Sequence, residues 1–107
     1  PMRRENVYQG LLIKRLKEEF PGAVVLKNDS GYQQGIPDLT ILHGPRWAML
    51  EDKRDKDEPH RPNQDWWVNR LHDLSYAAFI YPQNEEDVFD ELRHALEPRR
   101  HPRYLKS

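Results

Sequence analysis

Apolar side chains in this chain recur at two spacings, one helical and one extended. Between residues 5 and 20 they recur every three or four positions, at Tyr8, Leu12, Leu16 and Phe20. A Pro-Gly pair follows directly, and neither residue continues a helix well. This segment therefore predicts an amphipathic helix that ends near Phe20.

Two further segments have helical spacing, and each follows an asparagine that is suited to cap a helix through its side-chain oxygen. The first begins at Asn63, and its apolar stripe consists of Trp67, Val68, Leu71 and Leu74. The second begins at Asn84 and ends before Pro98, and its stripe consists of Val88, Phe89, Leu92 and Leu96.

Four shorter segments are rich in β-branched and other apolar residues and predict strands, at 23–27, 39–42, 47–53 and 76–81. The His-Gly-Pro-Arg run at 43–46 predicts a tight hairpin between the second and third strands. The element order is thus α-β-β-β-α-β-α. It predicts the α/β class, with an α+β mixed sheet flanked by helices.

Composition excludes some classes of protein and site but does not identify a function. The 107 residues suffice for one domain, and we expect a single domain spanning 1–107 with a basic tail at 98–107. There is no cysteine, which excludes disulfides and thiolate metal sites. No apolar stretch is long enough to span a bilayer, and no signal-peptide segment opens the chain. We therefore expect an intracellular, cytoplasmic protein without a membrane partner.

The hairpin brings chemistry-bearing residues together. If Gly44 and Pro45 form its turn, Asp38 lies opposite Glu51 on one face of the sheet. Lys53 points to the same side as Glu51, whereas the side chain of Asp52 points away. Two opposed carboxylates repel each other unless a cation lies between them, and Mg²⁺ prefers such oxygen ligands. Two acids and an ammonium group around a metal ion suit phosphodiester hydrolysis.

A purely structural interpretation stays open for each motif. Glu-Asp-Lys before a charged loop is often the exposed end of a strand, and Pro-Asp commonly opens a turn. The opposed pair also depends on a symmetric hairpin, so a bulge would separate Asp38 from Glu51.

The run from Gly35 to Leu42, with Glu51-Asp52-Lys53 and Gln64 after it, resembles the PD-(D/E)XK nuclease superfamily. Within it the chain is similar to the VRR-NUC branch, whose stand-alone viral members are similar to Holliday junction resolvases. The resemblance covers about residues 5–92 and implies a restriction-endonuclease-like αβββαβα core. It departs at Ser75, where the branch usually has glycine.

The resemblance implies a role for each matched position. Asp38 and Glu51 would bind Mg²⁺ or Mn²⁺ together with the backbone carbonyl of Asp52, and Lys53 would be catalytic. Glu5 would lie near the metal, in contact with it directly or through water, or else be an ordinary first-turn acid. Gln64 shares the inward face of its helix, where it would bond to the site or to DNA. Together with Asp38, Glu51 and Lys53 it would make up the catalytic set.

Charged and aromatic residues around these motifs suggest partners. Lys27, Arg54, Lys56 and Arg61 flank the site in the sequence and could bind phosphates, although acidic residues alternate with the last three. Trp66 falls off the apolar stripe, which favours a homodimer contact, with base stacking as the alternative.

We therefore expect a metal-dependent, structure-selective DNA endonuclease, specifically a homodimeric Holliday junction resolvase without a nucleotide cofactor. If it is viral, it would act in the host cytoplasm. The alternatives are a less selective single-strand or flap nuclease and a non-catalytic DNA-binding module of the same fold.

Overall fold

A computed structural model describes the backbone of residues 3–97 and the side chains of residues 7–97. The predicted element order is confirmed. The elements are α1 (Arg3–Glu19), β1 (Val24–Lys27), β2 (Leu39–His43), β3 (Arg46–Asp52), α2 (Gln64–Leu74), β4 (Ala77–Ile80) and α3 (Glu85–Leu96). The predicted basic tail at 98–107 lies outside the described residues. Among the described helices, none has both the length and the apolar character needed to cross a bilayer.

The four strands form one mixed sheet in the order β1-β2-β3-β4, with only the β3–β4 pair parallel. The β2–β3 register is the predicted one, since Thr40 pairs with Met49 and Leu42 with Trp47. Gly44 has a φ of 60°, and the ring of Pro45 fixes a negative φ after it. This combination is that of a type II′ turn, whose twist matches the two strands.

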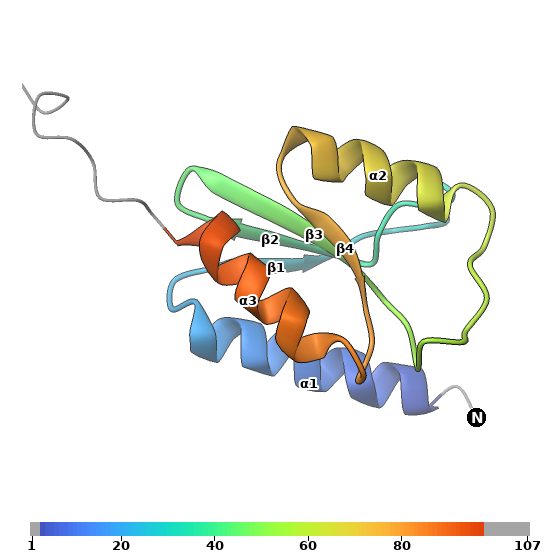
Figure 1. Cartoon of the computed structure of the whole chain (residues 1–107), viewed down its shortest axis with the longest axis horizontal. Helices are drawn as coiled ribbons and strands as arrows, with labels where there is room; N and C mark the ends of the chain where they lie inside the picture. The colour runs from blue at the N-terminus through green and yellow to red at the C-terminus, as the bar shows by residue number, and fades with distance from the viewer. Residues whose placement is uncertain (1–2, 98–107) are drawn as a thin grey trace, which may run out of the picture.

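The helices lie on both faces of the sheet, with α1 and α3 on one face and α2 on the other (Figure 1). The larger core lies between the sheet and the α1–α3 pair. Its fully buried residues include Leu16, Phe20, Leu39, Ile41, Leu50 and Phe89. A smaller core beneath α2 consists of Val68, Leu71 and Ala77 with partly buried neighbours. The predicted core is therefore confirmed in the stripe of α3, whereas Leu74 of α2 is 58% exposed.

Asn63 and Asn84 occupy the N-cap positions of α2 and α3, as predicted. The predicted side-chain capping hydrogen bond is wrong, because neither asparagine makes one. Asn84 instead accepts a hydrogen bond from the Tyr81 backbone N–H and donates one to the Phe79 carbonyl. Asn63 adopts a left-handed conformation with a φ of 72°. Its side chain packs beside Gly35 in the loop before β2.

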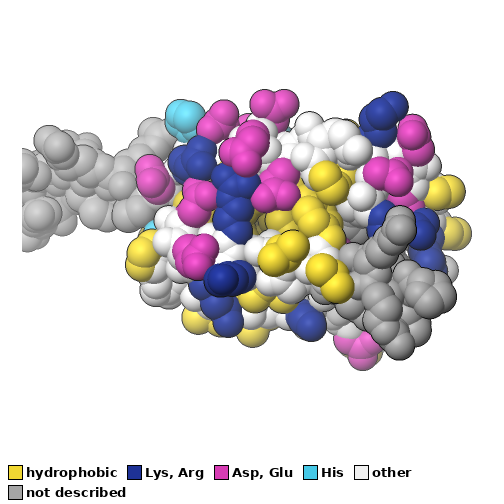
Figure 2. Space-filling model, turned by 90° about the horizontal axis from the view of Figure 1, so that it is seen from below, with side chains coloured by type: hydrophobic (Ala, Val, Ile, Leu, Met, Phe, Trp, Pro, Cys, Tyr) yellow, Lys and Arg dark blue, Asp and Glu magenta, His cyan; other side chains and the backbone are white. Residues whose placement is uncertain are grey.

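Ion pairs connect α1 to α3 across the outside of the larger core. Arg15 contacts Glu85 at 2.7 Å and Glu86 at 2.8 Å, and its guanidinium lies 3.9 Å from the centre of the Phe89 ring. Arg93 contacts Glu19 at 2.8 Å. On this side of the molecule, basic and acidic side chains lie next to one another (Figure 2). These partly exposed ion pairs add to the apolar packing between the two helices.

Gly35 sets the loop before β2 against the start of α2. Its φ is 88°, and a Cβ atom there would lie 2.7 Å from the Asn63 Cβ and 2.8 Å from the Asn63 carbonyl carbon. Only glycine fits such a close approach at this backbone conformation. The contact brings the loop that leads into Asp38 against the start of the helix that carries Gln64.

Gly35→Ala is accordingly expected to lower the free energy of unfolding by about 2–4 kcal/mol, from backbone strain and overpacking. Urea denaturation monitored by tryptophan fluorescence measures it. The matched control is Gly10→Ala, since a Cβ at this helical glycine meets nothing within 4 Å. In the control, the free energy of unfolding is expected to rise by about 0.5–1 kcal/mol. Equal stability of Gly35→Ala and the wild type would contradict the proposed packing constraint.

Candidate functional site

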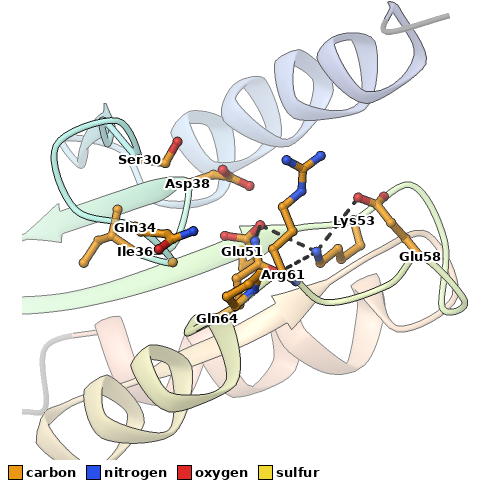
Figure 3. A pocket seen from close by; sticks show the side chains of 11 residues that line it. Ser30, Gln34, Ile36, Asp38, Glu51, Lys53, Glu58, Arg61 and Gln64 are labelled. Carbon is orange, nitrogen blue, oxygen red and sulfur yellow. Dashed lines mark hydrogen bonds and ion pairs between the residues drawn. The ribbon is translucent and has the colours of Figure 1, made fainter.

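A cavity of about 580 Å³ opens where the loop before β2, the end of β3 and the start of α2 meet (Figure 3). Its lining includes Asp38, Glu51, Lys53 and Gln64, the four residues predicted to be catalytic. They come from separate segments of the chain, so only the fold brings them together. The cavity is also lined by Ser30, Gln34, Gly35, Ile36, Glu58, Arg61 and Pro62.

Asp38 lies just before β2, one residue beyond the last regular β2–β3 pair. Its carbonyl accepts a hydrogen bond from the Asn28 backbone N–H at 2.7 Å. Its carboxylate accepts one from the Asp52 backbone N–H at 3.1 Å. The expected register is therefore right, but the regular strand pairing stops short of Asp38. The carboxylate replaces a backbone acceptor there, which fixes the side chain beside the end of β3.

Glu51, Lys53 and Gln64 form a buried hydrogen-bonded chain at the floor of the cavity. The side chain of Gln64 donates to Glu51 Oε2 at 2.9 Å and accepts from Lys53 Nζ at 2.7 Å. Lys53 Nζ lies 3.9 Å from Glu51 Oε2, and each of the three residues is at most 7% exposed. The predicted inward orientation of Gln64 is confirmed. This amide spaces the ammonium from the carboxylate and orients both.

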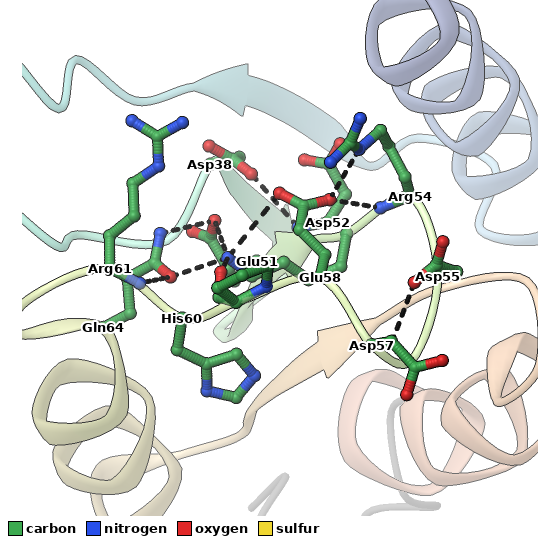
Figure 4. A network of polar contacts seen from close by, with 12 residues as sticks. Asp38, Glu51, Asp52, Arg54, Asp55, Asp57, Glu58, His60, Arg61 and Gln64 are labelled. Carbon is green, nitrogen blue, oxygen red and sulfur yellow. Dashed lines mark hydrogen bonds and ion pairs between the residues drawn. The ribbon is translucent and has the colours of Figure 1, made fainter.

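The charged loop after β3 folds back over Lys53. The carbonyl of Pro59 accepts a hydrogen bond from Lys53 Nζ at 3.1 Å. Glu58 Oε2 lies 3.9 Å from the same Nζ atom (Figure 3). Glu58 also accepts hydrogen bonds from the backbone N–H and the guanidinium of Arg54 (Figure 4). Sequence reasoning missed Glu58, because acidic and basic residues alternate in this loop and nothing singles out one carboxylate.

Burial weakens the acidity of the carboxyl groups. Desolvation, with repulsion from Glu51 in addition, raises the pKa of Asp38 to about 6, although bonds from Asp52 oppose the shift. Desolvation likewise raises the pKa of Glu51 to about 7, against the attraction of Lys53. Without a counter-cation these groups take up protons at a higher pH than exposed carboxyl groups do, because burial disfavours their charged forms.

The Asp52 side chain points to the opposite face of the sheet, as predicted, and is fully buried there. Gln9 of α1 donates to its Oδ1 at 3.0 Å. Sequence reasoning missed Gln9, although it lies four residues after Glu5 and three before Leu12, on the stripe of α1. Glu5 belongs to the first turns of α1, but its side chain lies outside the described residues. The predicted metal contact of Glu5 therefore stays a prediction.

Asp52 is nevertheless coupled to the site. Desolvation first, and then hydrogen bonding and repulsion involving the Asp38 carboxyl, raise the pKa of Asp52 to about 8. Between the ordinary value of 3.8 and about 8, the folded protein holds a proton that the unfolded chain releases. Stability from this group therefore falls as the pH rises through that interval.

Asp52→Asn is expected to remove this loss of stability with rising pH. In EDTA, the free energy of unfolding of the wild type should decrease from pH 5 to pH 8, and the variant should decrease less. At pH 8 the variant should be the more stable protein, because its neutral amide has no charged form that burial disfavours. Urea denaturation across this range measures it, with the exposed Asp73→Asn as control. A less stable Asp52→Asn protein at pH 8 would contradict the assignment.

The oxygen donors of the site suit a hard divalent cation. Glu51 Oε1 is buried and, among the described residues, has no hydrogen-bond partner. No cluster of three or more histidine, cysteine or acidic side chains with metal-binding geometry occurs in the described part of the chain. Mg²⁺ does not need one, because it commonly binds through one or two carboxylates and keeps several waters. Asp38 and Glu51 provide that minimum.

Of the four cations predicted to bind nucleic acid, Arg61 alone lines the cavity. Its side chain extends beside the cavity in Figure 3. Arg54 pairs with Glu58 at 3.2 Å, and Lys56 lies 3.7 Å from Asp57. Lys27 is exposed on the edge strand β1, away from the cavity lining. The positive charge nearest the opposed acids thus comes from Lys53 and Arg61.

Trp66 projects from α2 and is 60% exposed, as its position off the apolar stripe predicted. Its ring meets that of Trp67 edge to face, with the ring centres 5.0 Å apart. A large indole in this position leaves apolar area uncovered within the described protein.

No protein-family model, curated protein or solved structure matches this chain. What the site does must therefore be inferred from its own residues and their geometry.

Proposed function

We propose that this protein is a metal-dependent endonuclease that hydrolyses phosphodiester bonds, with the restriction-endonuclease-like core of PD-(D/E)XK nucleases. The observation that carries the proposal is the buried Glu51–Gln64–Lys53 chain facing Asp38 across an open cavity. A protein that needed these groups only for stability would gain little from them, since buried opposed acids cost free energy.

The proposed chemistry divides the work among three kinds of group. Asp38 and Glu51, with the Asp52 backbone carbonyl, would hold Mg²⁺ or Mn²⁺. When bound, such an ion polarises a phosphoryl oxygen and lowers the pKa of a water molecule. Water then attacks phosphorus, the bond to one sugar oxygen breaks, and that oxygen takes up a proton.

Lys53 would stabilise the charge that develops on the phosphoryl group during this attack. Its ammonium is held by Gln64 and the Pro59 carbonyl, so it is positioned before substrate binds. A fixed charge in a site with little water stabilises a transition state more than a mobile one. Arg61, at the cavity edge, would bind the phosphate backbone.

The proposed substrate is branched DNA, specifically a four-way junction cut by a homodimer. Two opposed strands must be cut together, and a two-fold dimer matches the symmetry of such a junction. The exposed indole of Trp66 supports a contact between copies of the chain on the α2 side. This part of the proposal rests on resemblance to resolvases and on that surface.

Trp66→Ala is therefore expected to weaken the dimer by about 2 kcal/mol or more, a typical cost for losing an aromatic anchor at an interface. Multi-angle light scattering over a concentration series measures the dissociation constant. Lys56→Ala, an exposed change in the loop after β3, serves as the control. An unchanged mass at every concentration would remove Trp66 from the interface.

Cleavage of labelled four-way junction, flap, single-stranded and linear duplex DNA tests the proposed function. Each substrate is incubated with Mg²⁺, with Mn²⁺ and with EDTA. Paired, symmetric nicks in the junction alone would support the resolvase. Metal-dependent cutting of every substrate would support a less selective nuclease. If no substrate is cut under any condition, the chain is a non-catalytic binding module instead.

A further inference from the structure

A second hollow adjoins the candidate active site on the α2 side of the sheet. It has a volume of about 560 Å³ and is lined by Asn28, Asp29, Tyr32, Gln33, Ile36 and Met49. We call it the Tyr32 groove. Ile36 also lines the Asp38–Glu51 cavity, so the two spaces meet at this side chain. The groove is therefore next to the position proposed for the cleaved phosphate.

The composition of the groove suits a flat ring with polar edges. Tyr32 is 89% exposed, which leaves its ring faces without packing partners in the fold. Ile36 and Met49 are partly buried and add apolar surface. The Gln33 side chain makes no hydrogen bond to any described residue, so its amide is available as both donor and acceptor. The lining contains no pair of oppositely charged side chains.

The loop that carries Tyr32 has defined geometry. The Asp29 carbonyl accepts hydrogen bonds from the backbone N–H groups of Tyr32 and Gln33, and its carboxylate accepts one from Gly31. The side chain of Asn28 ties the start of the loop to the Pro37 carbonyl at 2.8 Å. The backbone that carries Tyr32 is thus held at a set distance from the start of β2.

We propose that the Tyr32 groove binds one unpaired nucleobase of the DNA substrate, stacked on the Tyr32 ring, beside the phosphate held in the Asp38–Glu51 cavity. This inference rests on the proposed function and narrows its substrate class. A base in a regular duplex would first have to leave the stack and its pair, which costs a few kcal/mol. Stacking on an aromatic ring tolerates any base, because every base has a π face. The site therefore favours DNA in which the base beside the cut leaves the stack easily, such as a branch point or a flap.

Equilibrium binding without cleavage tests the groove. Fluorescence anisotropy in EDTA compares a short oligothymidylate with an abasic phosphodiester of the same length and charge. The wild type is expected to bind the oligothymidylate more tightly. Tyr32→Ala should lower its affinity for oligothymidylate roughly 5- to 150-fold, the range for loss of one base–aromatic stack. Its affinity for the abasic strand should not change.

Two matched variants separate stacking from other effects. Tyr32→Phe keeps the ring and should bind both strands as the wild type does. Arg61→Ala should lower the affinity for both strands alike, because it removes a phosphate contact. The inference is overturned if Tyr32→Ala binds oligothymidylate as tightly as the wild type does. It is also overturned if the variant loses affinity for both strands equally. Equal wild-type affinity for the two strands, or no binding of either, overturns it too. Because the assay needs no cleavage, failure of the nuclease proposal gives a different result: base-dependent binding persists in a protein that cuts nothing.

Discussion

Asp38→Asn is expected to reduce cleavage to the level seen in EDTA while the protein stays folded and still binds DNA. The change removes one charge from the pair proposed to hold the metal, and it keeps the shape of the side chain. The amide oxygen can still accept the hydrogen bond that Asp52 N–H donates to Asp38 at 3.1 Å. Loss of a like charge beside Glu51 should also raise stability at neutral pH when no metal is present.

Single-turnover cleavage with Mg²⁺ measures the rate, and anisotropy with an uncleaved substrate in EDTA measures binding. Asp57→Asn is the matched control, because it makes the same substitution at an exposed loop carboxylate. An Asp38→Asn protein that cuts at the wild-type rate would show that the metal assignment is wrong. A variant that neither folds nor binds would show that Asp38 is structural.

The second large effect is expected from Lys53→Met, which keeps the volume of the side chain and removes its charge. The rate should fall about 10²- to 10³-fold, the usual cost of removing one group that stabilises a transition-state charge. Metal binding should persist, because Lys53 contacts Glu51 only at 3.9 Å and through Gln64. Without the ammonium, the pKa of Glu51 should rise further, since attraction by Lys53 opposes its shift.

Rapid-quench kinetics at saturating substrate, together with Mn²⁺ binding, separate the two roles. A lower cleavage rate at full metal occupancy assigns Lys53 to the chemical step. Loss of metal binding with the same variant would instead place Lys53 among the groups that build the metal site. A normal rate would exclude it from both.

The fold was largely predictable because its signals are local. The stripe of α3 repeats at helical spacing and is fully buried, and the Gly44-Pro45 turn alone sets the β2–β3 register. From that register and the alternation of a strand, the shared face of Glu51 and Lys53 follows directly.

The predictions failed where a tertiary contact replaced a local one. Asn63 has the sequence preference of a cap, but its contact with Gly35 places it in a left-handed conformation. Asn84 uses its amide in the turn after β4 rather than on α3. Leu74 has the spacing of a core residue, yet it is at the last position of α2 and is exposed.

Two residues that support the site were missed in the sequence, for different reasons. Glu58 gains its role because the loop after β3 turns back over Lys53, and no spacing in the sequence encodes that turn. Gln9 had a usable signal, because a polar residue on the buried stripe of α1 needs a hydrogen-bond partner. That partner, Asp52, lies 43 residues away in the sequence.

The central claim is that Asp38 and Glu51 together form a divalent-cation site. Isothermal titration of Mn²⁺ into the wild type near pH 6.5, in buffers of different ionisation enthalpy, tests it most directly. Because the metal-free pKa values are about 6 and about 7, ion binding should release protons, and the measured heat should depend on the buffer. Asp38→Asn should show little binding. Absence of ion binding by the wild type, or equal binding by the variant, would contradict the account.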